Sequence, residues 1–207
     1  MMQLIGMLDS PYVRRVAVSL HALGLPFAQR CISVFSTYEQ FKAINPVVRA
    51  PTLVCDDGTV LMDSSLILDY AETLAQPHSL LPGAASERAI ALRIVGLALA
   101  ACDKTVQIVY ECKLRPTEKQ YEPWLARVTE QLHTTYGLLE REWAVQPAPF
   151  AVSAATIAAA VAWRFTHEKL PGTLDAAAHR QLQALSDWAE AQPAFRAAPY
   201  DEQTRHG

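Results

Sequence analysis

The first part of the chain alternates between short apolar runs and stretches whose apolar residues recur at helical spacing. In residues 11–24, Val13, Val16 and Leu20 fall on one side of a helix, and Gly24 follows as a typical C-terminal stop. The pattern predicts strands over 3–7 and 26–34 and helices over 11–24 and 36–45.

Residues 50–63 hold two apolar runs on either side of Asp56-Asp57-Gly58, which is a strong signal for a β-hairpin. A further helical pattern covers residues 64–75. The predicted order of elements is therefore β-α-β-α-β-β-α. This order favours a mixed sheet, with parallel strand pairs from the crossovers and an antiparallel hairpin at its end.

Strand signals disappear in the second part of the chain. Residues 76–86 (QPHSLLPGAAS) interrupt the pattern and indicate a linker. Beyond them, the spacing predicts helices over 86–112, 121–143, 153–165 and 176–191. We expect an α/β domain over residues 1–77, a linker over 78–85 and an all-helical bundle over 86–207.

Composition narrows the class of protein. The 207 residues are 51% hydrophobic and 19% charged, which is enough apolar material for a substantial core. The net charge is only −3 and the basic residues are scattered, so we expect no nucleic-acid partner. Apolar windows are broken well before the ~20 residues that a membrane span needs. No export signal is visible at the N-terminus, so we expect a soluble cytoplasmic protein.

The cysteines and histidines show no ligand pattern. Cys31, Cys55, Cys102 and Cys112 lie far apart, with no C-x-x-C pair. We expect each to be a buried, reduced thiol. The six histidines have no metal-ligand spacing either, so no metal is expected.

Ser10 permits two interpretations. A serine followed by proline at the first helical position is a strong N-cap signature. The turn from a strand onto a helix N-terminus is also a place where anions and thiolates are held. A redox site at this turn needs Cys at the first and usually the fourth position, where this chain has Ser10 and Val13. A hydroxyl can still donate a hydrogen bond to a sulfur that a ligand brings.

Two further segments combine structural and binding interpretations. Pro51 opens a predicted strand and is either an ordinary trans proline or a cis one. A cis bond would turn the backbone of Ala50 outward, towards an extended peptide. Asp63 and Ser64 stand immediately before the helical residues 65–75, where they can cap the helix, hold a carboxylate and an ammonium, or do both.

Together these segments resemble the cytosolic glutathione S-transferases, of the bacterial type with serine at the catalytic position. The resemblance covers nearly the whole chain, through SPYVRRVAVSL, NPVVRAPTLV, DGTVLMDSSLILDYAE, LLPG, residues 153–157 and LSDWAEAQPAF. It implies a thioredoxin-like N-terminal domain, a C-terminal helical bundle and glutathione as co-substrate. It also implies a homodimer, which no feature of the sequence itself indicates.

The resemblance implies roles for individual positions. Ser10 would donate its hydroxyl to the glutathione sulfur and so activate the thiolate. Ala50, ahead of a cis Pro51, would pair its backbone with the cysteinyl residue of glutathione. Asp63 and Ser64 would bind the γ-glutamyl end. Arg49 stands where the family often has a lysine that meets the glycyl carboxylate.

The pocket for the second substrate is expected to be walled by aromatic residues. The candidates are Tyr12, Phe35, Tyr110 and Trp163. Aromatic residues at helical spacing are more often part of a core than of a substrate wall, and that alternative stays open here.

The chain departs from the family pattern at two positions. The capping segment at residues 153–157 has Thr156 where an aspartate is usual, which predicts a weaker start of that helix. Asp9 places an anion next to Ser10, and a carboxylate that pointed into the site would raise the thiol pKa. We expect Asp9 to point to solvent.

Three functions are compatible with this sequence. The preferred one is a glutathione transferase that attacks a hydrophobic electrophile. The second is a glutathione-dependent isomerase or peroxidase on the same fold. The third is a non-catalytic, glutathione-binding or regulatory member of the family.

Overall fold

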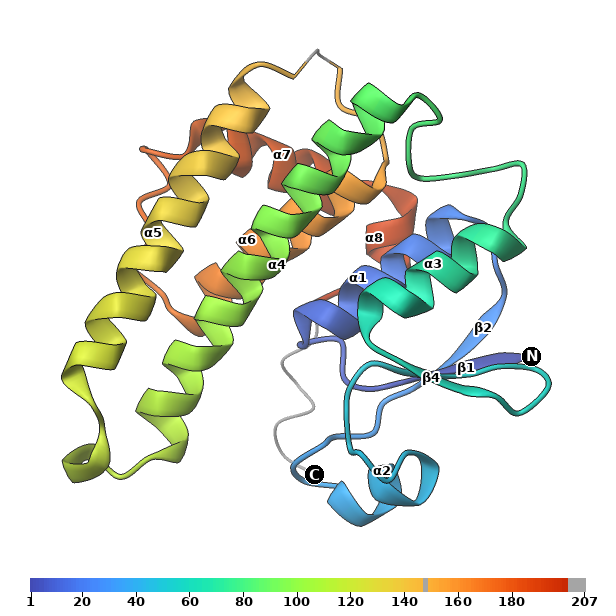
Figure 1. The fold of residues 1–207 in the computed structure, drawn as a ribbon, viewed down its shortest axis with the longest axis horizontal. Coiled ribbons are helices and arrows are strands. Elements are labelled where there is room, and N and C mark those ends of the chain that lie inside the picture. Colours follow the sequence, from blue (N-terminus) through green and yellow to red (C-terminus); the bar gives the residue numbers. More distant parts are fainter. Residues whose placement is uncertain (147–148, 201–207) are drawn as a thin grey trace. The chain divides into compact units, whose positions relative to one another are not determined.

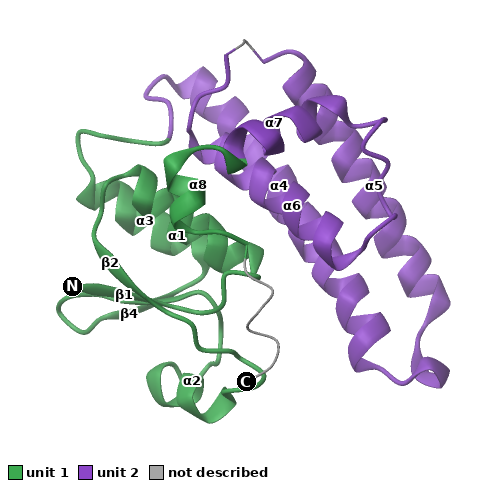
Figure 2. Cartoon of the chain, turned by 180° about the vertical axis from the view of Figure 1, so that it is seen from behind, with its two compact units in different colours: residues 1–80, 190–207 green, residues 81–189 purple. Residues whose placement is uncertain are grey.

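The computed structural model describes residues 1–146 and 149–200. It divides into two compact units, which Figure 2 colours separately. Unit 1 comprises Met1–Leu80 together with the chain from Glu190 onward, and unit 2 comprises Leu81–Ala189. The domain boundaries expected from the sequence stay a prediction. The sequence analysis did not predict that the C-terminal segment belongs to unit 1.

Unit 1 contains the α/β part of the chain (Figure 1). Its elements are β1 (Met2–Ile5), α1 (Pro11–Ala22), β2 (Phe27–Arg30), α2 (Tyr38–Ile44), β3 (Thr52–Val54), β4 (Val60–Met62), α3 (Ser64–Leu74) and α8 (Pro193–Ala197). The predicted sequence of strands and helices over residues 1–75 is confirmed. The short helix α8 was not predicted.

The sheet is mixed, in the order β2-β1-β3-β4. β1 pairs with β2 in parallel, and β3 runs antiparallel to both β1 and β4. The predicted parallel pairing at the second crossover is therefore wrong. Ile5 lies opposite both Arg30, where β2 ends, and Thr52, where β3 begins. The chain between β2 and β3 thus begins and finishes at the same end of the sheet, so β3 runs antiparallel to β1.

Helices cover both faces of this sheet. Figure 1 shows α1 and α3 on one face and α2 on the other. Leu4 and Ile5 are both completely buried, although successive strand residues point to opposite faces. Ile5 packs in a cluster with Ile32 and with Phe41 from α2. The central strand therefore needs cover on both sides, as in a parallel α/β layer arrangement.

The C-terminal segment is attached to α1 by a buried arginine. Arg14 is almost fully buried, and its two terminal nitrogens donate to the Glu190 carboxylate at 2.8 and 2.7 Å. Its Nε donates to the carbonyl oxygen of Ala198 at 3.0 Å. Its guanidinium carbon lies 5.5 Å from the centre of the buried Phe195 ring. Residues 190–198 thus complete the cover of α1.

Unit 2 is all helical. It is built from α4 (Ala85–Leu114), the 3₁₀ turn η1 (Thr117–Lys119), α5 (Glu122–Ala144), α6 (Ala154–Lys169) and α7 (Arg180–Glu190), whose last residue is counted with unit 1. The four predicted helices are confirmed. Among the described residues, no helix combines the length and apolarity that would be needed to cross a membrane.

A chain of hydroxyl groups links three helices inside unit 2. Tyr136 of α5 donates from its hydroxyl to the carbonyl oxygen of Ala162 at 2.9 Å and lies 2.6 Å from the Thr166 hydroxyl. Thr166 of α6 is in turn 2.8 Å from the hydroxyl of Thr105 in α4. Because all three side chains are buried, these hydrogen bonds specify how α4, α5 and α6 pack.

The start of α6 is not weakened by Thr156. Ser153 accepts a hydrogen bond from the Thr156 backbone N–H, and the Thr156 hydroxyl oxygen accepts one from the Ser153 N–H at 2.8 Å. The threonine hydroxyl therefore replaces the usual carboxylate in a complete capping box. The predicted weakness of this helix start is wrong.

The cysteines divide into two pairs by exposure. Cys55 and Cys102 are buried, as predicted, whereas Cys31 and Cys112 are exposed. Cys31 directly follows the edge strand β2, and Cys112 lies in the last turn of α4. Both exposed cysteines therefore lie at or near the end of an element. The spacing of the cysteines along the sequence does not indicate this exposure.

Candidate functional site

The end of β1, the start of α1 and the approach to β3 meet at Gly6. Ile5 pairs with Thr52, so the residues that follow and precede this pair lie side by side. A Cβ atom on Gly6 would lie 2.5 Å from Val13 Cγ2 and 3.4 Å from Ala50 Cβ, and its φ is +139°. Only glycine fits this close approach. The sequence analysis placed Gly6 inside the predicted strand over 3–7, whereas β1 ends at Ile5, and it did not single out this glycine.

Ser10 caps α1 by accepting a hydrogen bond. Its Oγ receives the backbone N–H of Val13 at 3.4 Å, which is long for such a bond. Because the oxygen accepts in this bond, the hydroxyl proton remains available for donation. The two interpretations of Ser10 are therefore compatible. Asp9, its neighbour, is partly buried.

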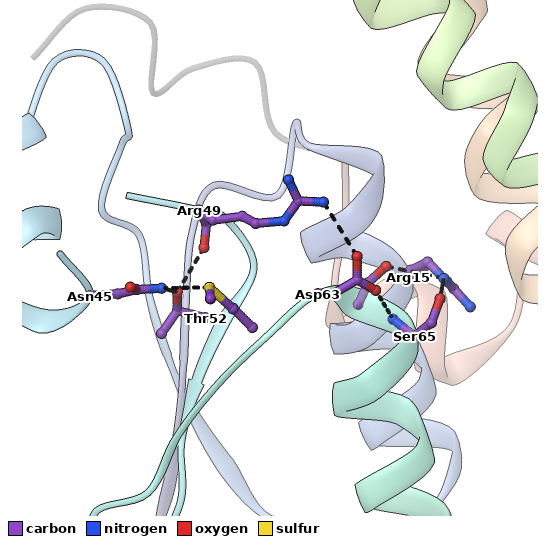
Figure 3. Close-up of polar contacts among 8 residues, drawn as sticks. Arg15, Asn45, Arg49, Thr52, Asp63 and Ser65 are labelled. Carbon is purple, nitrogen blue, oxygen red and sulfur yellow. Dashed lines mark hydrogen bonds and ion pairs between the residues drawn. The ribbon is translucent and has the colours of Figure 1, made fainter. Parts of the chain in front are cut away.

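Hydrogen bonds hold the loop before β3 in shape (Figure 3). The Asn45 side chain donates to the Thr52 hydroxyl at 2.9 Å and accepts from the Val47 N–H at 3.0 Å. The Thr52 hydroxyl donates to the carbonyl oxygen of Arg49 at 2.7 Å. The Ala50–Pro51 peptide bond within this loop is cis. The buried Asn45 thus fixes the segment that carries the candidate binding residues.

Two residues beside the candidate site have left-handed backbone conformations. Val48 has φ +53° and Asp63 has φ +71°. A β-branched valine is strongly disfavoured there, and such strain tends to occur at functional sites. Val48 packs against the buried cluster around Ile5 and Phe41, which holds it in place.

The N-terminus of α3 gathers charged and hydroxyl groups. Asp63 caps the helix, because its Oδ1 accepts the Ser65 N–H at 2.9 Å. Its Oδ2 lies 3.3 Å from Nη2 of Arg49. Nη1 of the buried Arg15 donates to the hydroxyls of Ser64 and Ser65 at 3.1 and 3.2 Å. Figure 3 shows both guanidinium groups approaching this helix end.

This arrangement suits a ligand that carries both signs of charge. The free N–H groups at the start of α3 favour an anion, and Arg15 and Arg49 add positive charge. Asp63 provides a carboxylate for a cation at the same place. Arg15 was not predicted as part of the site. The one available signal was that a second arginine directly follows Arg14 in the helix that starts after Ser10.

The four aromatic candidates are divided between the units. Tyr12 and Phe35 belong to unit 1, and Tyr110 and Trp163 belong to unit 2. Phe35 and Tyr110 are 61% and 45% exposed. Trp163 is only 2% exposed, and its indole nitrogen donates to the Gln183 side chain at 3.2 Å. Its burial favours the core alternative for Trp163.

Within residues 1–146 and 149–200, no group of three or more His, Cys, Asp or Glu side chains is placed to hold a metal ion.

Comparisons with known proteins find similarity to one family. Residues 4–79 match the family model described as "Glutathione S-transferase, N-terminal domain". The whole chain is similar to a glutathione S-transferase of Methylobacterium radiotolerans solved with glutathione sulfonate, at 28% identity, a TM-score of 0.89, and coverage of 97% of this chain and 96% of that one. A Pseudomonas fluorescens family member solved with bound glutathione is similar at 27% identity, a TM-score of 0.83, and coverage of 97% and 100%.

A curated relative is also similar. "Uncharacterized GST-like protein YibF" of Escherichia coli is 28% identical over 139 residues, which is 67% of this chain and 68% of that protein.

A thioredoxin-like α/β unit followed by an all-helical unit is the fold of these solved transferases. The N-terminal region of this chain matches the family model, and the chain as a whole is similar in fold and sequence to solved glutathione S-transferases.

Proposed function

We propose that this protein binds glutathione through unit 1 and activates its thiol for attack on a hydrophobic electrophile. The observation that carries the proposal is the state of Ser10, whose oxygen caps α1 while its proton remains available. The helix N-terminus behind it adds positive potential. In this proposal the enzyme is a cytoplasmic homodimer, and Tyr12 and Phe35 of unit 1 face the second substrate.

The proposed binding roles follow from the positions of the groups. Ala50 presents its backbone next to the cis bond to Pro51 and pairs with the cysteinyl residue of glutathione. Asp63 and Ser64 hold the γ-glutamyl end at the start of α3. The relatives solved with glutathione or its derivatives support this ligand class.

The proposed interactions are strong enough to lower the pKa of the glutathione thiol. A free thiol has a pKa of about 8.5, and each unit of lowering needs about 1.4 kcal/mol of preferential thiolate stabilisation. A charge-assisted hydrogen bond contributes about 1.5–3 kcal/mol, and a helix N-terminus about 0.3–1 kcal/mol. Together they lower the thiol pKa by roughly one to three units. The thiolate is then a substantial fraction of the bound thiol near neutral pH, and its share grows with the size of the shift.

Ser10→Ala tests the proposal. We expect glutathione affinity to change little, turnover of model electrophiles to fall, and the pKa of the bound thiol, followed by thiolate absorbance, to rise. Ser10→Thr retains the hydroxyl and should recover part of the activity. Ser153→Ala removes an N-cap in unit 2 and controls for a general loss of stability of about 1 kcal/mol.

Three results would contradict the proposal. Turnover that stays unchanged in Ser10→Ala between pH 6 and 8 would exclude Ser10 as the activating group. Binding of glutathione without turnover across classes of electrophile would favour the non-catalytic alternative. Failure of the wild type to bind glutathione would exclude the transferase, isomerase and peroxidase functions alike.

A further inference from the structure

Gly6 lies where the chain leaves β1 for the turn that carries Ser10. Its N–H donates to the carbonyl oxygen of Arg30 at 3.0 Å, which extends the parallel ladder between β1 and β2 by one bond (Figure 1). The next bond of such a ladder would run from the N–H of Ile32 to the Gly6 carbonyl oxygen. That N–H donates instead to the Arg30 carbonyl oxygen at 2.9 Å. The ladder therefore offers no donor to the carbonyl of the buried Gly6.

The side chain of Gln29 supplies a donor in its place. Its Nε2 donates to the Gly6 carbonyl oxygen at 2.7 Å. Because a carbonyl oxygen can only accept, this bond fixes which way round the amide lies. The amide oxygen Oε1 is buried and has no hydrogen-bond partner among the described residues. An apolar side chain would avoid the cost of that unpaired oxygen, so the contribution particular to Gln29 is its bond to Gly6.

The backbone at Gly6 needs this support because glycine is conformationally permissive. The φ of +139° and the close approach of Val13 require a glycine here. Glycine has more accessible backbone conformations than other residues, so its own torsional preferences do not fix the direction of the next peptide. Two hydrogen bonds to β2, one from its N–H and one to its carbonyl oxygen, hold Gly6 instead.

The direction of the chain at Gly6 determines where Ser10 lies. Residues 7–9 separate the two, and the turn is closed by a hydrogen bond from the Ser10 N–H to the Met7 carbonyl oxygen at 3.1 Å. A rotation of the peptide between Gly6 and Met7 would therefore move the Ser10 hydroxyl. A hydrogen bond weakens steeply when its donor is misaligned, so a small displacement is enough to weaken a bond to a sulfur.

We propose that Gln29 is a positioning residue, which holds the Gly6 carbonyl so that the Ser10 hydroxyl meets the sulfur of bound glutathione. This inference rests on the proposed function, in which Ser10 stabilises the thiolate. Gln29 acts through the backbone and not on the ligand. Loss of its donor should therefore raise the pKa of the bound thiol, because the thiolate loses part of its hydrogen bond, and should leave the other ligand contacts in place.

Donor-free variants of Gln29 test the inference. Gln29→Met keeps a similar volume without an N–H group, and Gln29→Leu is a second such variant. Gln3→Met is the matched control, because Gln3 lies on the adjacent strand β1 and accepts an exposed hydrogen bond from the Arg30 side chain. Thiolate absorbance gives the pKa of bound glutathione. Calorimetry gives the affinity for S-methylglutathione, which has no thiol, and thermal melting shows that each variant is folded.

We expect Gln29→Met and Gln29→Leu to raise the pKa of the bound thiol by roughly half a unit to one unit, so the thiolate fraction below that pKa falls about three- to tenfold. Turnover at pH 6–7 should fall by the same factor. The affinity for S-methylglutathione should change by less than about twofold. In a Ser10→Ala background, Gln29→Met should not shift the thiol pKa further, because its effect passes through Ser10. Gln3→Met should change neither quantity.

The outcomes separate this inference from the function on which it rests. If Ser10→Ala raises the thiol pKa and the Gln29 variants do not, the inference is wrong while the proposed function stands. A shift that persists in full in the Ser10→Ala background also overturns it, as does an S-methylglutathione affinity that falls in parallel with turnover. If Ser10→Ala leaves the thiol pKa unchanged, the proposed function fails and this inference fails with it.

Discussion

At the scale of single residues, the proposed thiol site combines a hydrogen-bond donor with a neighbouring anion, and the two have opposite effects on the thiol pKa. In the proposed function, Ser10 stabilises the glutathione thiolate through its hydroxyl and its place at the start of α1. Asp9 is the adjacent, partly buried carboxylate. An anion close to a thiol favours the protonated thiol and therefore raises its pKa. The rate at neutral pH then depends on how strongly Asp9 opposes Ser10.

Asp9→Asn should shift this balance towards the thiolate. Removing the negative charge lowers the pKa of the bound glutathione thiol and raises turnover most at pH 6–7, where the thiolate is scarce. The pKa is measured by titrating the thiolate absorbance of the complex. Asp69→Asn, an exposed position in the middle of α3, serves as the control. An unchanged thiol pKa in Asp9→Asn would mean that this carboxylate points away from the sulfur.

At the scale of elements, α1 is held by a segment far away in the chain. Arg14 follows Ser10 by one helical turn, and its backbone N–H donates to the Ser10 carbonyl oxygen at 2.9 Å. Its side chain is bound to Glu190 and Ala198. A buried guanidinium needs such partners, because an unpaired buried charge is strongly unfavourable. The helix that carries Ser10 is therefore stabilised by the C-terminal segment.

Arg14→Met should lower the free energy of unfolding of unit 1 by about 3 kcal/mol, because Glu190 loses its partner in a partly buried place. Urea denaturation followed by circular dichroism measures this change. The double variant Arg14→Met/Glu190→Gln should recover part of the loss. Arg164→Met, which breaks the exposed pair with Glu168, should cost less than about 1 kcal/mol. Equal losses in both single variants would argue against the buried anchor.

At the scale of the whole molecule, stability should depend on pH through the core of unit 2. Burial raises the pKa of Tyr136 well above its ordinary value of 10.0. The unfolded chain then releases this proton at a lower pH than the folded one. The contribution of Tyr136 to stability is fully present below pH 10 and is lost as the pH rises above it.

Tyr136→Phe should therefore flatten the decline of the melting temperature above pH 10. At neutral pH the same variant is less stable by about 1–3 kcal/mol, because the hydrogen bonds to Ala162 and Thr166 are lost. Melting curves from pH 7 to 11 measure both effects. Tyr121→Phe changes an exposed tyrosine and should alter neither. A wild-type-like alkaline decline in Tyr136→Phe would place the titrating group elsewhere.

Local sequence signals predicted most of the fold. Ser10-Pro11 marked the start of α1, the Asp-Asp-Gly turn marked the β3–β4 hairpin, and Ser153 marked the start of α6, because caps and turns depend on neighbouring residues. The direction of β3 was not predictable in this way, since it depends on which end of the sheet the chain leaves. The same is true of the exposure of Cys31 and Cys112.

Patterns in the sequence predicted the elements other than α8, their order, the family resemblance and the residue types at the candidate site. Each of these depends on local propensity or on motifs a few residues long. The contacts of Arg15 with Ser64, of Arg49 with Asp63 and of Arg14 with Glu190 could not be predicted in this way, because they form only when the chain folds. Contacts between residues far apart in the chain arise from packing, which pairs charges and hydrogen-bonding groups that no local pattern connects.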